Sequence, residues 1–280
     1  MISKIRRLWL SIRVRLDSIY LGLFVRPRKR PDPIDIPRCF ADFVEKFGGE
    51  VCDRRPQAEG LRTKIADYVF RANNVVAELK CLETDPFYAP GGTRRLWSEL
   101  KKAGMSDDSI IAWSLGGGRL SEEAIWRLAT VFRRRIEKIT RKAEKQVEAT
   151  KRTYDMPSAQ GLLLIANDNN YLFSYPQKFA LISDVFARHF KDSCIKGFVF
   201  FTPNVPMRVP DSLREWHPWT TSYSNTADDS FVAFVDDLGH HWNRVFFSTD
   251  RQRYPHLKSP DREFFRRWMM NAKNVDIRKK

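Results

Sequence analysis

The sequence lacks several features that usually reveal a protein's class. It has no uninterrupted apolar stretch of about 18 residues, which argues against an ordinary transmembrane helix. Its four cysteines form no CxxC pair and its five histidines no HExxH pattern, which argues against zinc sites of either kind. No GK[ST] triplet follows the glycine-rich stretches, so they do not predict a nucleotide-binding P-loop.

Acidic residues are scarce relative to basic ones: 49 Lys and Arg stand against 34 Asp and Glu, a formal net charge of +15. This excess favours a polyanionic partner, either nucleic acid or an anionic membrane surface, without choosing between them. The 42% hydrophobic and 30% charged residues are ordinary for a globular chain. Scattered cysteines and the lack of a cleavable signal sequence predict a cytoplasmic protein with reduced thiols.

The first 30 residues contain nine basic residues and one acid, with apolar residues at helical spacing. They predict a basic amphipathic helix that packs on the core, docks a partner protein or a second copy of the chain, or lies on a membrane or nucleic acid. Four prolines within 26–37 predict a linker. A core at 38–202 and a C-terminal part at 203–280 follow.

Apolar periodicity within the core predicts alternating helices and strands. The predicted strands cover residues 50–52, 61–70, 74–82, 161–168 and 197–204. The predicted helices cover residues 38–47, 121–154 and a segment that opens near Ser174. A hairpin turn at 71–74 joins two of the strands, and residues 83–120 form a helical insertion. This order predicts an α/β fold with a central mixed β-sheet flanked by helices.

The C-terminal part is predicted to add strands and a helix that pack on the core. The apolar runs at 231–237 and 244–250 predict two strands on either side of a turn around Gly239. A final amphipathic helix is predicted at 261–272, and the aromatic-rich segment 214–223 is predicted to be a loop.

Two charged residues lie on the apolar strand 74–82. Because side chains alternate along a strand, Glu78 and Lys80 project from the same face. The hairpin turn can bring Asp67 beside Glu78, and two adjacent carboxylates repel each other unless a cation lies between them. Mg²⁺ suits such a site, since it binds through one or two carboxylates and takes further oxygens from water and phosphate. The three residues therefore predict a magnesium-dependent active site.

This pattern, Asp67 followed by Glu78-Leu79-Lys80 on an apolar strand between a short and a long helix, resembles the PD-(D/E)xK nuclease superfamily over residues 38–202. The resemblance implies a restriction-endonuclease-like core that hydrolyses phosphodiester bonds, most simply in DNA, as an endonuclease or exonuclease. It also implies a role in restriction, repair or defence against phage. Ala66 stands where the family name has proline.

The resemblance assigns roles to individual residues. It implies that Mg²⁺ or Mn²⁺ is held by Asp67, Glu78 and the backbone carbonyl of Leu79, with Lys80 at the attacking water. Many members of the family also carry an acidic residue on the first helix, and several use a glutamine or a basic residue from the long helix. Asp42, Glu45 and Glu50 are candidates for the acidic position, of which Glu45 is assigned as a further metal ligand, and Gln146, on the inward side of the long helix, is assigned as a further catalytic residue.

The long helix 121–154 is rich in basic residues, and four of them are predicted to contact nucleic-acid phosphates: Arg134, Lys138, Arg141 and Lys145. An alternative function uses these basic helices alone, in a noncatalytic protein that binds nucleic acid or a membrane surface and whose acid pair is coincidental. A second triplet, Glu99-Leu100-Lys101, lies in a helical pattern, where its charges point in different directions. It is predicted to be a surface pair without catalytic function.

Overall fold

The computed structural model describes residues 33–52, 64–83, 91–114, 118–168, 170, 172–189, 192–205, 207–208 and 215–248. The predicted helices at 1–30 and 261–272 lie outside these ranges and remain predictions. Within the described ranges, no helix combines the length and apolar character that a membrane span requires.

The centre of the molecule is a mixed six-stranded sheet with the strand order β1-β2-β3-β4-β5-β8. Its strands are β1 (Glu50–Val51), β2 (Tyr68–Phe70), β3 (Val75–Cys81), β4 (Gln160–Ala166), β5 (Ile195–Phe201) and β8 (Trp219–Tyr223). β3, β4 and β5 run parallel, whereas the strands on either side of them pair antiparallel. A separate short ribbon pairs β6 (Met207–Arg208) with β7 (Glu215–Trp216). The predicted α/β class with a mixed sheet is confirmed.

The α-helices of the described residues are α2 (Ile36–Phe47), α3 (Gly92–Lys102), α4 (Asp107–Ser114), α5 (Glu122–Thr153), α6 (Tyr175–His189) and α7 (Asp229–Ser248), and a short 3₁₀ helix, η3 (Arg71–Asn73), joins β2 to β3. Local sequence sets several of their ends. Asp35 accepts a hydrogen bond from the Arg38 N–H at the start of α2, and Gly48 ends that helix with a left-handed φ of 94°. Ser121 caps α5 in the same way, through the N–H of Ala124.

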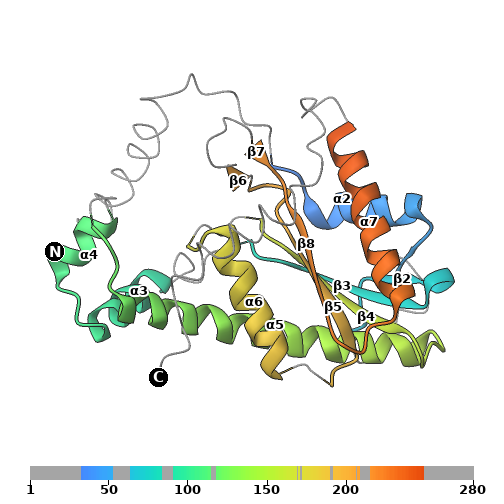
Figure 1. Cartoon of the computed structure of the whole chain (residues 1–280), viewed down its shortest axis with the longest axis horizontal. Coiled ribbons are helices and arrows are strands. Elements are labelled where there is room, and N and C mark those ends of the chain that lie inside the picture. The colour runs from blue at the N-terminus through green and yellow to red at the C-terminus, as the bar shows by residue number, and fades with distance from the viewer. Residues whose placement is uncertain are drawn as a thin grey trace.

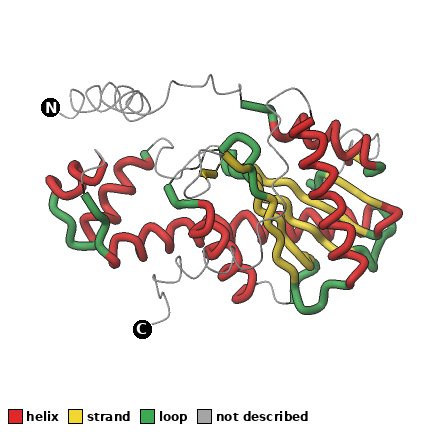
Figure 2. The backbone as a smooth tube through the Cα atoms, turned by 45° about the horizontal axis from the view of Figure 1, so that its top comes forward, coloured by secondary structure: helices red, strands yellow, loops and turns green. Residues whose placement is uncertain are grey.

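Helices cover both faces of the sheet (Figure 2). On one face, Leu163 of β4 and Phe198 of β5 pack in one apolar cluster with residues of α5 and α6. On the other face, Leu162 and Val199 of the same strands pack with α2 and α7. Figure 1 shows α5, the longest helix, extending past the sheet toward α3 and α4. The described parts of the segment 83–120 form α3 and α4, and the buried Leu96 and Leu100 of α3 join the α5 cluster.

The two strands predicted at 231–237 and 244–250 are wrong, because α7 runs as one continuous helix through all the described residues of these segments, as far as Ser248. Its buried residues recur at spacings of three and four along the chain, as on one face of a helix: Phe231, Phe234, Val235, Leu238 and Trp242. Gly239 forms no turn. A Cβ at this position would overlap the indole of Trp219, so the glycine permits α7 to lie close to β8.

The loop predicted at 214–223 is also wrong, since β8 forms here as the edge strand next to β5. The aromatic side chains of Trp219 and Tyr223 pack against the α2 and α7 cluster. Thr220 faces the opposite way and accepts a hydrogen bond from the Tyr175 hydroxyl of α6 at 2.6 Å. This alternation is the period of a strand, which the polar residues of the segment obscured.

Candidate active site

The β2–β3 hairpin brings Asp67 and Glu78 together, as the sequence predicts. Tyr68 pairs with Ala77 in the antiparallel register, which places the preceding Asp67 beside Glu78. The N–H of Asp67 donates to Oε2 of Glu78 at 3.1 Å, and the N–H of Leu79 donates to Oδ2 of Asp67 at 2.8 Å. Each carboxylate is thus anchored by the backbone of the opposite strand segment. The tight turn between them includes Asn74 in the left-handed region, with φ of 54°.

Glu78 is a fully buried acid on a strand of apolar residues. Burial raises its pKa to about 8, and repulsion from Asp67 acts in the same direction, whereas Lys80 opposes both. An ionised carboxylate is therefore costly at this position unless positive charge is supplied close by.

Lys80 lies on the same face of β3 and supplies part of that charge. Its Nζ donates to Oε1 of Glu78 and, at 2.9 Å, to Oε1 of Gln146 on α5. The Lys80 side chain is 17% exposed, compared with 1% for Glu78, so the amine lies nearer the solvent than the acid does. A substrate that approaches from outside would meet the lysine first.

Gln146 belongs to this group, although it lies 66 residues from Lys80 in sequence. It is 2% exposed, and its Nε2 donates to the carbonyl oxygen of Ile65 at 3.0 Å. The side chain therefore links α5 both to β3 and to the segment that precedes Asp67. The inward position predicted for Gln146 is confirmed, and its catalytic role remains a prediction.

Sequence reasoning missed one member of the network, Thr150. This fully buried residue lies one turn after Gln146, and its Oγ1 accepts a hydrogen bond from the N–H of Ala66 at 2.6 Å. The same hydroxyl donates to the Gln146 carbonyl at 2.8 Å. Its position four residues after an inward glutamine was the available signal, because residues at this spacing share a helix face.

The structure does not bring Glu45 to the acid pair. Glu45 is exposed on α2, whose buried Phe40 and Val44 pack on the sheet face opposite to that of Glu78. The apolar side of α2 therefore occupies the sheet, and its polar side turns away from it. This prediction failed because helical spacing shows which residues share a helix side and not which face of a sheet the helix covers.

The donor set of the remaining residues fits a hard cation. Among the residues described, no three His, Cys, Asp or Glu side chains are grouped as a metal site. Mg²⁺ does not require such a group, since one or two carboxylates, water and substrate oxygens complete its coordination. Asp67, Glu78 and the Leu79 carbonyl offer oxygen atoms only. The observation that favours a cation here is the raised pKa of the buried Glu78, because a bound cation would stabilise the charged form of this carboxyl group.

The four predicted phosphate-binding residues all have exposed positions on α5. Arg134, Lys138 and Lys145 lie on its outer side, and Arg141 forms an ion pair with Glu137 at 2.8 Å. The basic residues therefore line the surface of the same helix that carries Gln146. Their contact with nucleic acid remains a prediction.

The second triplet behaves as expected of a surface helix. Glu99 pairs with Lys102 at 3.0 Å, and Lys101 pairs with Asp107 at 2.8 Å. The glutamate and lysine of this triplet thus have different partners, whereas Glu78 and Lys80 bind each other. The two triplets therefore differ because one lies on a strand, β3, and the other on a helix, α3.

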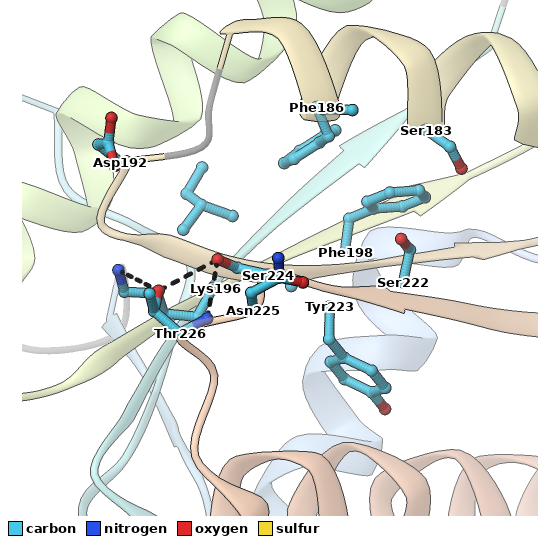
Figure 3. Close-up of a pocket in the computed structure, with 13 residues that line it drawn as sticks. Ser183, Phe186, Asp192, Lys196, Phe198, Ser222, Tyr223, Ser224, Asn225 and Thr226 are labelled. Atoms are coloured by element: carbon cyan, nitrogen blue, oxygen red, sulfur yellow. Dashed lines mark hydrogen bonds between the residues drawn. The ribbon is translucent and has the colours of Figure 1, made fainter.

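A cavity of about 280 Å³ lies elsewhere in the molecule. Figure 3 shows the residues that line it. It lies between α6 and the strands β5 and β8, at the end of β5 where Lys196 donates to Thr226 at 3.0 Å. Phe186 and Phe198 both line the cavity and stack on each other with ring centroids 4.6 Å apart. None of the residues around Glu78 contributes to this cavity, so the acid pair does not lie within it.

Comparisons of the chain with protein-family models, curated proteins and solved structures gave no match.

Proposed function

We propose that this chain is a divalent-metal-dependent nuclease of the PD-(D/E)xK type that hydrolyses phosphodiester bonds, most simply in DNA. The observation that carries the proposal is the buried Glu78, held between Asp67 and Lys80 on a central strand. The succession of α2, the β1–β2–β3 strands, α5 and β4 is the order that a restriction-endonuclease-like core has, and it supports the proposal.

Asp67 and Glu78 would hold Mg²⁺ or Mn²⁺ together with the carbonyl of Leu79. The cation would supply positive charge for the phosphate oxygens and lower the pKa of a coordinated water. The backbone N–H groups that anchor both carboxylates keep them adjacent in spite of their repulsion. This preorganisation matters because Mg²⁺ tolerates little deviation from octahedral geometry.

Lys80 would act on the reacting groups directly. Its partly exposed amine can donate a hydrogen bond to the attacked phosphate or orient the attacking water. Gln146 accepts a hydrogen bond from this amine and thereby directs it. A second N–H of the amine is donated to Glu78, so the third is left for the substrate. The exposed basic side chains of α5 would hold the phosphate backbone on either side of the cleaved bond.

Cleavage of plasmid, linear duplex, single-stranded DNA and RNA, each with Mg²⁺, Mn²⁺ or EDTA, tests the proposal. We expect metal-dependent cleavage that Glu78→Gln and Lys80→Met each reduce by about 100-fold or more. The matched controls are Glu99→Gln and Lys101→Met, which make the same changes in the second triplet and should retain activity. Undiminished cleavage by Glu78→Gln would falsify the assignment of this site.

The basic surface of α5 also supports a second function, that of a binding protein without catalytic activity. A noncatalytic protein could bind nucleic acid, or a membrane surface, through these residues alone. Binding that falls steeply with salt concentration, without cleavage under any metal, would favour this function over the nuclease.

A further inference from the structure

The hydroxyl of Thr150 forms two hydrogen bonds, one within α5 and one to a residue outside this helix. Buried threonines in helices often donate to the carbonyl four residues earlier, and Thr140 of the same helix does so with Ile136 at 2.9 Å. Thr150 donates to Gln146 in this way at 2.8 Å. It also accepts a hydrogen bond from Ala66, a residue 84 positions away in sequence. This second bond has no role within α5.

The second bond acts on a single peptide group. The carbonyl of Ile65 and the N–H of Ala66 belong to the same planar peptide unit. Gln146 donates to the carbonyl at 3.0 Å, and Thr150 accepts from the N–H at 2.6 Å. Two side chains one turn apart on α5 therefore bind both polar groups of this unit. Its plane can neither rotate nor shift without breaking one of these hydrogen bonds.

The next residue in the chain is Asp67. Its N–H binds Glu78 and its carboxylate binds the N–H of Leu79, so its own bonds orient it toward β3. The Ile65–Ala66 unit ends at the Cα of Ala66, so fixing this unit restricts where the backbone of the next residue, Asp67, can lie. Ala66 is fully buried, so without Thr150 its N–H would lose its partner away from solvent.

We infer that Thr150 is a positioning residue, which fixes the Asp67 carboxylate through the Ile65–Ala66 peptide so that Asp67 and Glu78 can hold one divalent cation. This inference rests on the proposed nuclease function. Thr150 itself touches neither metal nor substrate in this role. Residues that orient ligands in this way typically affect metal affinity or activity by about 10-fold to 100-fold.

Three variants test the inference. Thr150→Val keeps the size of the side chain and removes both hydrogen bonds, whereas Thr150→Ser keeps the hydroxyl. Thr140→Val removes the corresponding hydroxyl from a fully buried position on the same helix that has no bond to Ala66. Comparison of the two valine variants therefore separates the loss of the Ala66 contact from the general effect of a buried threonine in α5.

The first readout requires no metal: amide hydrogen exchange at Ala66 should be at least about tenfold faster in Thr150→Val than in Thr140→Val. The second is calorimetric titration with Mg²⁺, in which Thr150→Val should bind about 10-fold to 100-fold more weakly and Thr150→Ser like the wild type. In cleavage assays, the Mg²⁺ concentration for half-maximal rate should rise while the KM for nucleic acid stays unchanged.

Equal Ala66 exchange and equal Mg²⁺ affinity in the two valine variants, in an enzyme that cuts, would overturn the inference and leave the nuclease proposal standing. A wild-type protein that cuts no nucleic acid would instead overturn the nuclease proposal. If Thr150→Val does not fold, Thr150→Cys and Thr150→Ser provide the same comparison. The cysteine, a weak hydrogen-bonding group, should then show the weakened Mg²⁺ binding and the serine should not.

Discussion

At the scale of single residues, Glu78 of the proposed site lies where the protein disfavours the charged form of its carboxyl group. A carboxyl with an ordinary pKa near 4.5 is held where burial and Asp67 raise its pKa to about 8. Groups with such shifts concentrate at functional sites, because a fold built for stability alone has no reason to bury an acid beside another. Lys80 compensates only part of this cost, which leaves room for a bound cation.

The raised pKa of Glu78 makes stability depend on pH. Because the folded state holds this proton more tightly than the unfolded state, the contribution is fully present below pH 4.5 and is lost as pH rises to about 8. In EDTA, the wild type should lose up to about 1.4 kcal/mol of unfolding free energy per pH unit in this window, relative to Glu78→Gln. Urea denaturation at successive pH values measures the difference. Parallel pH profiles for the two proteins would show that the pKa of Glu78 is not raised in the folded state.

At the scale of elements, sequence patterns predicted those parts of the fold in which one period dominates. β3, β4 and β5 follow continuous apolar runs, and α5 follows a long helical repeat between clear caps. These are also the elements that carry Glu78, Lys80 and Gln146. Most of the proposed active site could therefore be predicted before the structure was known.

The elements that were missed had competing signals. In α7, aromatic and β-branched residues favoured strands, and Gly239 favoured a turn, although the spacing of Phe231, Phe234 and Leu238 is helical. The helical form of α7 is stabilised by the packing of these residues against α2 and β8. The bond from Ala66 to Thr150 was beyond sequence reasoning for another reason, since it joins residues 84 positions apart. No local pattern encodes such a contact.

Gly239 provides a test of how closely α7 packs on β8. In an exposed helix interior, Gly→Ala stabilises by about 1 kcal/mol through helix propensity. Here the added methyl would overlap the Trp219 indole, so Gly239→Ala should instead destabilise the protein by about 1–3 kcal/mol. Urea denaturation measures the sign. Ala233→Gly, at an exposed position of the same helix, is the control for propensity and should cost about 1 kcal/mol.

Replacing Trp219 by leucine in the Gly239→Ala background should recover part of the loss, because the smaller side chain leaves space for the methyl group. A stabilising Gly239→Ala change would mean that helix propensity outweighs the contact and that α7 can move away from β8 without penalty.

At the scale of the whole molecule, α5 connects the two parts of the proposed nuclease site. Its inner side carries Gln146 and Thr150 into the network around Glu78, and its outer side presents Arg134, Lys138 and Lys145. A single helix of 32 residues therefore relates the proposed phosphate-binding surface to the proposed catalytic group. Within α5, ten Lys and Arg stand against five Glu, so this helix contributes +5 of the net charge of +15.

If α5 holds the substrate backbone, its lysines should determine how binding depends on salt. Neutralising one phosphate contact lowers the slope of log K against log salt by about 0.9 for duplex DNA. Lys138→Gln and Lys145→Gln should each weaken duplex binding and reduce the slope by about this amount, while kcat at saturating DNA stays unchanged. Lys46→Gln alters an exposed lysine on α2, which covers the opposite face of the sheet, and should leave the slope unaltered. Fluorescence anisotropy with catalytically inactive Glu78→Gln protein as the background gives these slopes without cleavage. Equal slopes for all three lysine variants would mean that the substrate binds to another surface. The exposed lysines of α5 would then have no part in the function proposed for Gln146 and Thr150.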